Sequence, residues 1–277
     1  MSIKFTKSEN MSNTSSCHTL RCTKTFISMG ISHFVDAGTI SWDTPVIDVI
    51  PAFVTNSTFL TQSLTISDLL AHRSGYGDHD GDFLWSYGDG GTERDIVLKR
   101  LHGLPLRKRV GLTFMYSNVG FEIASIVLEE LAGEPWYSYV KRTIWTPLGM
   151  TSTYAGVPAL PADAARNLSA GHLYTISADP ADADAKYDLL SPTTPKLTGG
   201  ISNGFLGAGS VLSTASDFCK LMVHLLSLDS ASAMAGAQTA HMVVPHAWAA
   251  AFLKETIDDV GDALGAGYAL RPSRVAT

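Results

Sequence analysis

Two side chains in this sequence are of types that can transfer protons, and a polar amide lies close to one of them in the chain. Lys24 precedes a run of apolar residues at helical spacing, which places its amine near the first turn of a predicted helix. Tyr116 and Asn118 stand two residues apart, and in an extended segment such residues point to the same side. Amines and phenols take up and release protons in catalysis when their surroundings shift their pKa. Lys24 and Tyr116 could therefore move protons, and the amide of Asn118 could contact a polar group.

The elements that must hold these residues are mostly helices. Apolar periodicity and capping residues predict helices over residues 25–35, 65–74, 92–101 and 118–131, and a further one from Thr214 onward. Two of them begin with a predicted capping box, Thr65 with Asp68 and Thr214 with Asp217. Asn118 opens the most clearly amphipathic helix. A role as its N-cap is thus the structural alternative to a role in a site.

Strand signals are few. Residues 113–116 and 171–175 are the candidates, while residues 76–92 and 155–200 read as loops and residues 1–20 as a loose N-terminal segment without periodicity. Helices without a sheet behind them leave apolar faces uncovered. We therefore expect the helical faces that carry Phe26 and Phe121 to be poorly covered.

The composition is that of a globular protein. The chain has 277 residues, 45% of them apolar and 17% charged, which fits one large domain. Its net charge of −6 argues against nucleic acid as a partner. The short basic run at residues 107–109 is typical of a solvated loop.

Cysteine usage and hydropathy limit the compartment and the cofactors. Cys17, Cys22 and Cys219 form neither an even disulfide set nor a metal-binding pair. No charged and apolar leader is present, and no apolar stretch approaches the roughly 18 residues of a membrane span. We expect a cytoplasmic protein with no membrane partner, no metal and no organic cofactor.

Six short landmarks occur in an order that resembles the β-lactamase-related family, which includes class C β-lactamases, penicillin-binding proteins and esterases. They are Lys24-Thr25-Phe26, Trp42-Asp43-Thr44-Pro45-Val46, Leu69-Leu70-Ala71-His72-Arg73-Ser74-Gly75, Tyr116-Ser117-Asn118, Pro147-Leu148-Gly149-Met150-Thr151 and Leu212-Ser213-Thr214-Ala215-Ser216-Asp217. The resemblance implies an α+β, β-lactamase/transpeptidase-like fold. It also implies hydrolysis of a small ester, amide or lactam through an acyl-enzyme.

The resemblance assigns roles to the candidate residues and implies that Lys24, Tyr116 and Asn118 converge on one groove. Lys24 matches the lysine of a Ser-x-x-Lys motif, in which an i, i+3 spacing brings amine and serine hydroxyl to one helical face. Tyr116 and Asn118 match a Tyr-x-Asn motif, whose phenol relays protons while the amide contacts the substrate. His72 lies in a landmark at a helix end, where shaping a turn is its expected role.

The sequence departs from the family pattern at the nucleophile. Three residues before Lys24 stands Arg21, whose guanidinium stays protonated and cannot attack a carbonyl. Cys22 is about 200° around a helix from Lys24, so the lysine could not easily serve it. A literal Ser-x-x-Lys at Ser138 and Lys141 leads into the Pro-Leu-Gly-Met landmark, and we interpret it as a coincidence.

The third family motif, a Lys-Thr-Gly-like or His-x-Gly strand, is also not found after Asp217. We therefore expect residues 21–277 to form a partial, apparently truncated domain with most of the helical region and an incomplete antiparallel sheet. Two functions remain open from the sequence. One is descent from a serine hydrolase, inactive as written, and the other is a non-catalytic binding protein that uses the same groove.

Overall fold

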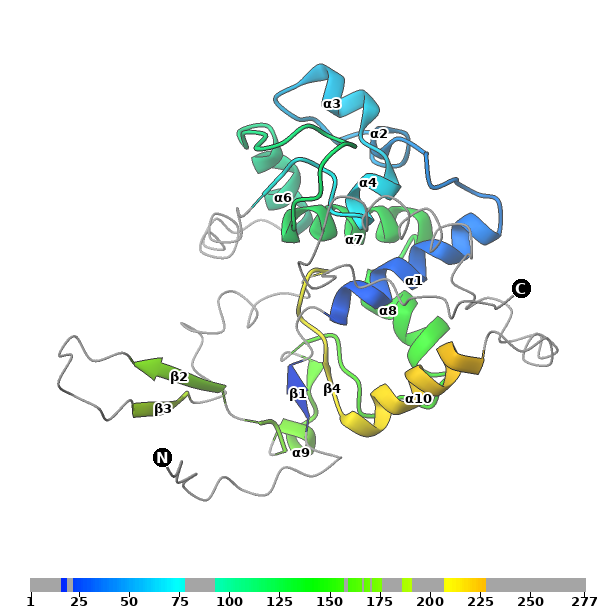
Figure 1. Ribbon diagram of the computed structural model, residues 1–277. Helices are drawn as coiled ribbons and strands as arrows, with labels where there is room; N and C mark the ends of the chain where they lie inside the picture. Colours follow the sequence, from blue (N-terminus) through cyan, green and yellow to red (C-terminus); the bar gives the residue numbers. More distant parts are fainter. Residues whose placement is uncertain are drawn as a thin grey trace, which may run out of the picture.

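The computed structural model describes residues 16–18, 22–77, 93–156, 159–165, 167–169, 171–175, 186–190 and 207–227. Its helices are α1 (Thr23–Asp36), α2 (Val46–Val49), α3 (Thr58–Ser63), α4 (Ile66–Leu70), α6 (Glu93–Leu101), α7 (Asn118–Ala132), α8 (Trp136–Val140), the π-helix η2 (Lys141–Trp145), α9 (Ala162–Ala165) and α10 (Ala215–Ser227). The strands are β1 (Cys17–His18), β2 (Gly171–Thr175), β3 (Lys186–Leu190) and β4 (Leu212–Ser213). Among these residues helices dominate, with two antiparallel two-stranded sheets, β1–β4 and β2–β3 (Figure 1).

The central helix is α7, as its apolar sequence predicts. It packs against α1, α4, α6 and α8, and most of its residues from Val119 to Leu128 are buried. Ser117 caps its first turn by accepting from the Gly120 amide, and Gly133 ends it in the left-handed conformation at φ 67°. The helix predicted over 118–131 is therefore confirmed.

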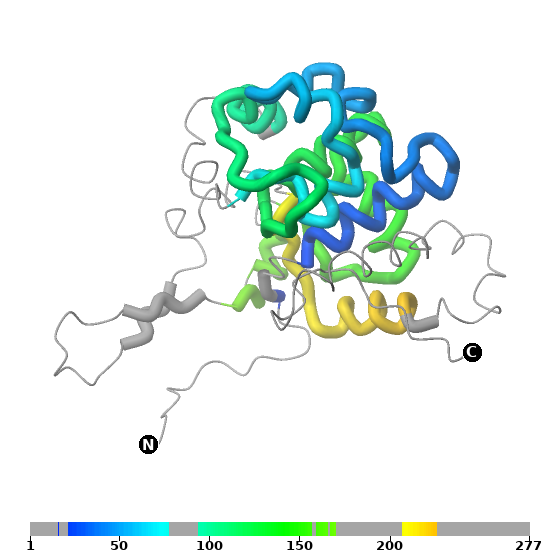
Figure 2. The backbone as a smooth tube through the Cα atoms, turned by 45° about the horizontal axis from the view of Figure 1, so that its top comes forward, coloured from blue at the N-terminus to red at the C-terminus, as the bar shows by residue number. Residues whose placement is uncertain are grey.

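Helix α1 crosses α7 at close range and connects it to the rest of the helical core. A Cβ on Gly30 would come within 2.6 Å of a Leu128 methyl carbon, so the absence of a side chain permits this approach. One turn earlier on α1, Phe26 makes edge contacts with Trp145 and with Phe218 of α10. In both views α10 lies on the side of α1 away from α2 and α3 (Figures 1 and 2).

The apolar faces of α1 and α7 are well covered, so the expectation of exposed faces is wrong. Phe26 is 0% exposed and Phe121 is 3% exposed. The Trp145 and Phe218 rings pack against Phe26, and the His72 ring packs against Phe121. These contacts cover the faces that we expected a sheet to cover. Helix on helix is a sufficient layer arrangement for these two faces.

Other local predictions have mixed outcomes. The capping box of Thr65 and Asp68 and the strand over 171–175 are confirmed. Residues 113–116 form no strand, because their segment is held by single backbone bonds such as Met115 N–H to the His72 carbonyl at 2.8 Å. Within the span predicted to be loose, residues 16–18 pair with Leu168, Ser213 and Leu212.

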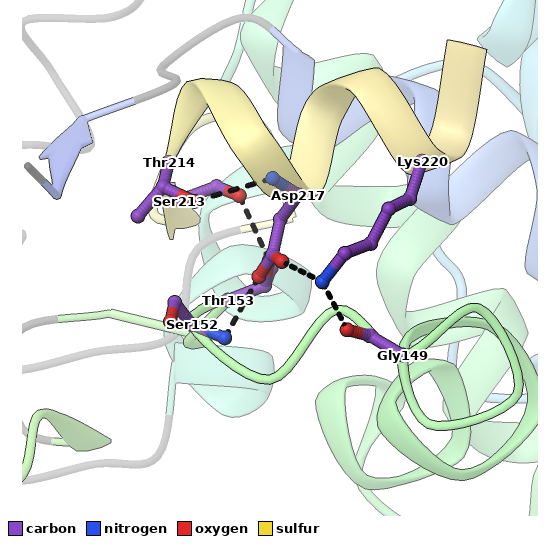
Figure 3. A network of polar contacts seen from close by, with 7 residues as sticks. All are labelled: Gly149, Ser152, Thr153, Ser213, Thr214, Asp217 and Lys220. Carbon is purple, nitrogen blue, oxygen red and sulfur yellow. Dashed lines mark hydrogen bonds and ion pairs between the residues drawn. The ribbon is translucent and has the colours of Figure 1, made fainter. Parts of the chain in front are cut away.

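The start of α10 differs from the predicted capping box in an informative way. Thr214 Oγ1 accepts from the Asp217 amide at 3.2 Å, but the Asp217 carboxylate does not return the bond to the cap. It accepts instead from the Ser152 amide at 2.7 Å and the Thr153 hydroxyl at 2.9 Å, and it pairs with Lys220 at 2.8 Å (Figure 3). Asp217 thus links α10 to the turn over residues 149–153 through hydrogen bonds.

Arg107, Lys108 and Arg109 are exposed, as expected of a solvated loop. No helix in the part of the chain that the structure describes is both long and apolar enough to cross a bilayer.

We predict that Asp217→Ala lowers the free energy of unfolding by about 2–4 kcal/mol, because the partly buried Ser152 amide and the buried Thr153 hydroxyl lose a charged acceptor. Lys220→Met removes only the half-exposed partner and should cost less than about 1 kcal/mol. Urea unfolding of the two variants and the parent measures both values. Equal losses for the two variants would contradict this role of Asp217.

Candidate active site

Lys24 is the second residue of α1 and is buried, with 1% of its surface exposed. Its Nζ donates to Asn118 Oδ1 at 2.7 Å and to the Ala208 carbonyl at 2.6 Å. The same atom lies 5.1 Å from the centroid of the Tyr116 ring and 5.4 Å from that of Phe121. Two carbonyl oxygens and two aromatic faces are the surroundings that an ammonium group needs when it leaves water.

The structure therefore brings together all three residues that the sequence singled out. Lys24 and Asn118 are 94 positions apart in the chain, and the crossing of α1 with α7 closes that separation. The proximity predicted for Lys24 and Tyr116 is confirmed.

Asn118 can contact Lys24 because another residue caps the helix. Ser117 is the N-cap of α7, and its side chain satisfies the Gly120 amide at 3.1 Å. The alternative reading of Asn118 as the N-cap is thus wrong. As the first residue of α7, Asn118 turns its amide oxygen to Lys24.

The His72 ring packs against the Tyr116 ring. The two rings stack with centroids 4.5 Å apart and planes 30° apart. His72 is 2% exposed and adopts a positive φ of 56°, and its Nδ1 accepts from the Ser117 amide at 3.0 Å. The predicted role of His72 in shaping a turn is confirmed, and the turn holds Tyr116 and Ser117 in place.

The electrostatics keep this histidine neutral. Burial, and then the positive charge of Lys24, lower the pKa of His72 to about 3, although the bond from the Ser117 amide opposes the shift. A ring nitrogen that accepts from an amide carries no proton, so the proton of the neutral ring is on Nε2. His72 is therefore a structural partner near neutral pH, not an acid or a base.

Residues 207–211 complete the surroundings of Lys24, and the sequence motifs did not point to them. Ala208 supplies the second carbonyl oxygen to Nζ, and Val211 N–H donates to Thr23 Oγ1 at 3.0 Å. Glu122 accepts from the amides of Gly207 and Ala208 at 3.2 and 3.1 Å. The available signal for Glu122 was its position four residues after Asn118, on the same helical face.

The remaining nucleophile candidates lie differently. Arg21 is outside the described residues. Cys22 is the N-cap of α1, partly buried and not in a disulfide. The pair Ser138 and Lys141 belongs to α8 and η2, where Lys141 is exposed, unlike Lys24. The described residues contain no group of three or more His, Cys, Asp or Glu side chains that could hold a metal ion.

Comparison with known proteins decides the family. A family model described as Beta-lactamase matches residues 21–276. The chain belongs to the β-lactamase family. Its landmarks and the convergence of Lys24, Tyr116 and Asn118 are therefore features of a β-lactamase-family chain.

Relatives of this β-lactamase-family chain include hydrolases and penicillin-binding proteins. An unguisins hydrolase of Aspergillus campestris (strain IBT 28561) is 30% identical over 210 residues, 74% of this chain and 36% of that protein. Penicillin-binding protein 4 of Amycolatopsis lactamdurans is 29% identical over 201 residues, 70% of this chain and 46% of that protein. The chain thus spans less than half the length of these relatives.

Solved structures confirm the β-lactamase/transpeptidase-like fold. The octameric penicillin-binding protein homologue from Pyrococcus abyssi has a TM-score of 0.61 at 20% identity, covering 79% of this chain and 46% of that one. The D-amino acid amidase from Ochrobactrum anthropi SV3, complexed with L-phenylalanine amide, has a TM-score of 0.60 at 24% identity, covering 78% and 57%.

We predict that His72 makes stability depend on pH in acid. Its pKa is lowered in the folded state, so the unfolded chain alone binds the proton below about pH 6.5, and stability falls between that pH and about 3. His72→Asn, which tolerates a positive φ, should remove up to about 1.4 kcal/mol of this loss per pH unit.

Urea unfolding between pH 7 and pH 4 measures this slope. His102→Asn, at an exposed position, serves as the control substitution. An unchanged slope in His72→Asn would show that His72 titrates normally in the folded protein.

Proposed function

We propose that this chain carries the proton-transfer half of an acyl-transferring serine hydrolase site, built for a small ester, amide or lactam. The observation that carries the proposal is the buried Lys24 Nζ, which touches Asn118 and Ala208 and lies against the Tyr116 ring. An amine in such a place can exchange a proton with a hydroxyl beside it.

Each of the three residues has a separate task in this proposal. Lys24, in its neutral amine form, donates its two N–H groups to Asn118 and Ala208 and takes the proton of an attacking hydroxyl on the Nζ lone pair. Tyr116 passes a proton toward the leaving group through its phenol, whose ring is held by His72. Asn118 keeps Nζ in place through Oδ1 and offers its amide N–H₂ to a substrate carbonyl.

Arg21 limits what this chain can do. A guanidinium three residues before Lys24 provides no nucleophile, so we propose that the chain forms no acyl-enzyme. The second candidate function follows from the same residue. A β-lactamase-family chain without a nucleophile can still bind a small carbonyl compound in the groove without turning it over.

The names of relatives support an amide or lactam as the bound group. The relatives include an unguisins hydrolase and penicillin-binding proteins, and one structural neighbour is a D-amino acid amidase. Because the chain spans only part of each of these proteins, the substrate class is a proposal for this chain.

We predict that the chain gains no mass and gives no burst when incubated with a chromogenic β-lactam or a chromogenic ester. Ser138→Ala should behave identically, since Ser138 is not beside a buried lysine. Intact-mass spectrometry is the measurement. A stoichiometric adduct on the parent chain would contradict the proposal, and its loss in Cys22→Ala would assign the adduct to that cysteine.

Arg21→Ser tests the lysine directly. We expect a slow acyl adduct that disappears in Arg21→Ser/Lys24→Met, because the serine then lacks a base. An adduct that persists without Lys24 would contradict its role, while saturable binding without an adduct would favour the binding protein.

A further inference from the structure

We infer that Glu122 is the positioning residue for Lys24, because it holds the backbone whose Ala208 carbonyl receives the lysine Nζ. The inference rests on the proposed function for the importance of Lys24, but its geometry is independent of any activity. Glu122 accepts from the amides of residues 207 and 208, and the Ala208 carbonyl in turn accepts from Lys24.

Helical spacing puts Glu122 where this task requires it. Asn118 and Glu122 are four residues apart on α7, so their side chains lie one turn apart on the same face. Asn118 contacts Nζ directly at 2.7 Å. Glu122, one turn further on, contacts the chain segment that forms the other side of the lysine site.

The two carboxylate oxygens are used separately. Oε2 accepts from Gly207 N–H at 3.2 Å, and Oε1 accepts from Ala208 N–H at 3.1 Å. Ala208 therefore gives its N–H to an anion and its carbonyl oxygen to the Lys24 ammonium at 2.6 Å. Opposite charges thus match the positive and negative ends of the same short piece of backbone.

Close packing leaves this segment little room to move. A Cβ on Gly207 would come within 2.4 Å of Ser125 Cβ and 2.9 Å of the Phe121 carbonyl oxygen, so the backbone lies directly on α7. At the other end of this segment, the Val211 amide donates a hydrogen bond to Thr23, the neighbour of Lys24 on α1. Glu122 lies at the α7 end of this segment and sets the position of the carbonyl between the two helices.

The substitution Glu122→Gln tests the arrangement with little change of shape. An amide has one acceptor oxygen, so it can satisfy only one of the two N–H groups, and its own N–H₂ opposes the other. Glu129→Gln is the matched control, because Glu129 is on the same helix and its carboxylate also accepts a backbone amide, from Trp136, away from Lys24.

The readout is the side-chain ¹⁵Nζ resonance of Lys24 and the exchange rate of its ammonium protons, measured by NMR on lysine-labelled protein and assigned with Lys24→Met. We expect Glu122→Gln to shift this resonance and to speed proton exchange about tenfold, as for the loss of one charge-assisted bond. Glu122→Ala should do more, and Glu129→Gln should do neither. Melting curves recorded in parallel identify any variant that unfolds.

The outcomes are distinct. An unchanged Lys24 resonance in folded Glu122→Gln would overturn the inference, and so would equal changes in Glu129→Gln. If Glu122→Ala does not fold, Glu122→Gln alone decides. The failure of Arg21→Ser to acylate would count against the proposed function and leave this test intact, since the NMR readout needs no substrate.

Discussion

The buried ammonium group of Lys24 is the interaction on which the arrangement of this chain depends. Moving a cation out of water costs several kcal/mol unless oxygen acceptors replace the lost hydration. Here the acceptors are Asn118 Oδ1 and the Ala208 carbonyl, from two segments far from Lys24 in the chain. The start of α1, the start of α7 and residues 207–211 must therefore meet at one point.

The His72 ring holds the Lys24 site in place without adding charge to it. His72 is neutral because burial and Lys24 lower its pKa, so it can lie flat against Tyr116 without repelling Lys24. Asp217 has a comparable structural task further away, where it joins α10 to the 149–153 turn (Figure 3). Asp217 and Glu122 both accept hydrogen bonds from backbone amides. The amides that Glu122 binds belong to residues 207 and 208, which form part of the Lys24 site.

Local sequence signals predicted α1, α4, α6, α7 and α10, because caps and periodicity act within one or two turns, but they did not predict the short helices α2, α3 and α9. They also identified Lys24, Tyr116 and Asn118 through the order of the family landmarks. They could not predict what holds Lys24, since Ala208 contributes only a carbonyl oxygen, which any residue carries. Nor could they separate the reciprocal box at Thr65 from the half-formed one at Thr214, because the difference lies in the tertiary contacts of Asp217.

The most direct test of this account is a double-mutant cycle on stability with Lys24→Met, Asn118→Leu and the double variant, measured by urea unfolding at pH 7. If Asn118 solvates the buried Lys24 ammonium, the two residues should be coupled by about 1.5–3 kcal/mol, the range for a hydrogen bond to a charged group. Losses that add to within about 0.5 kcal/mol would contradict the claim that this contact organises the site.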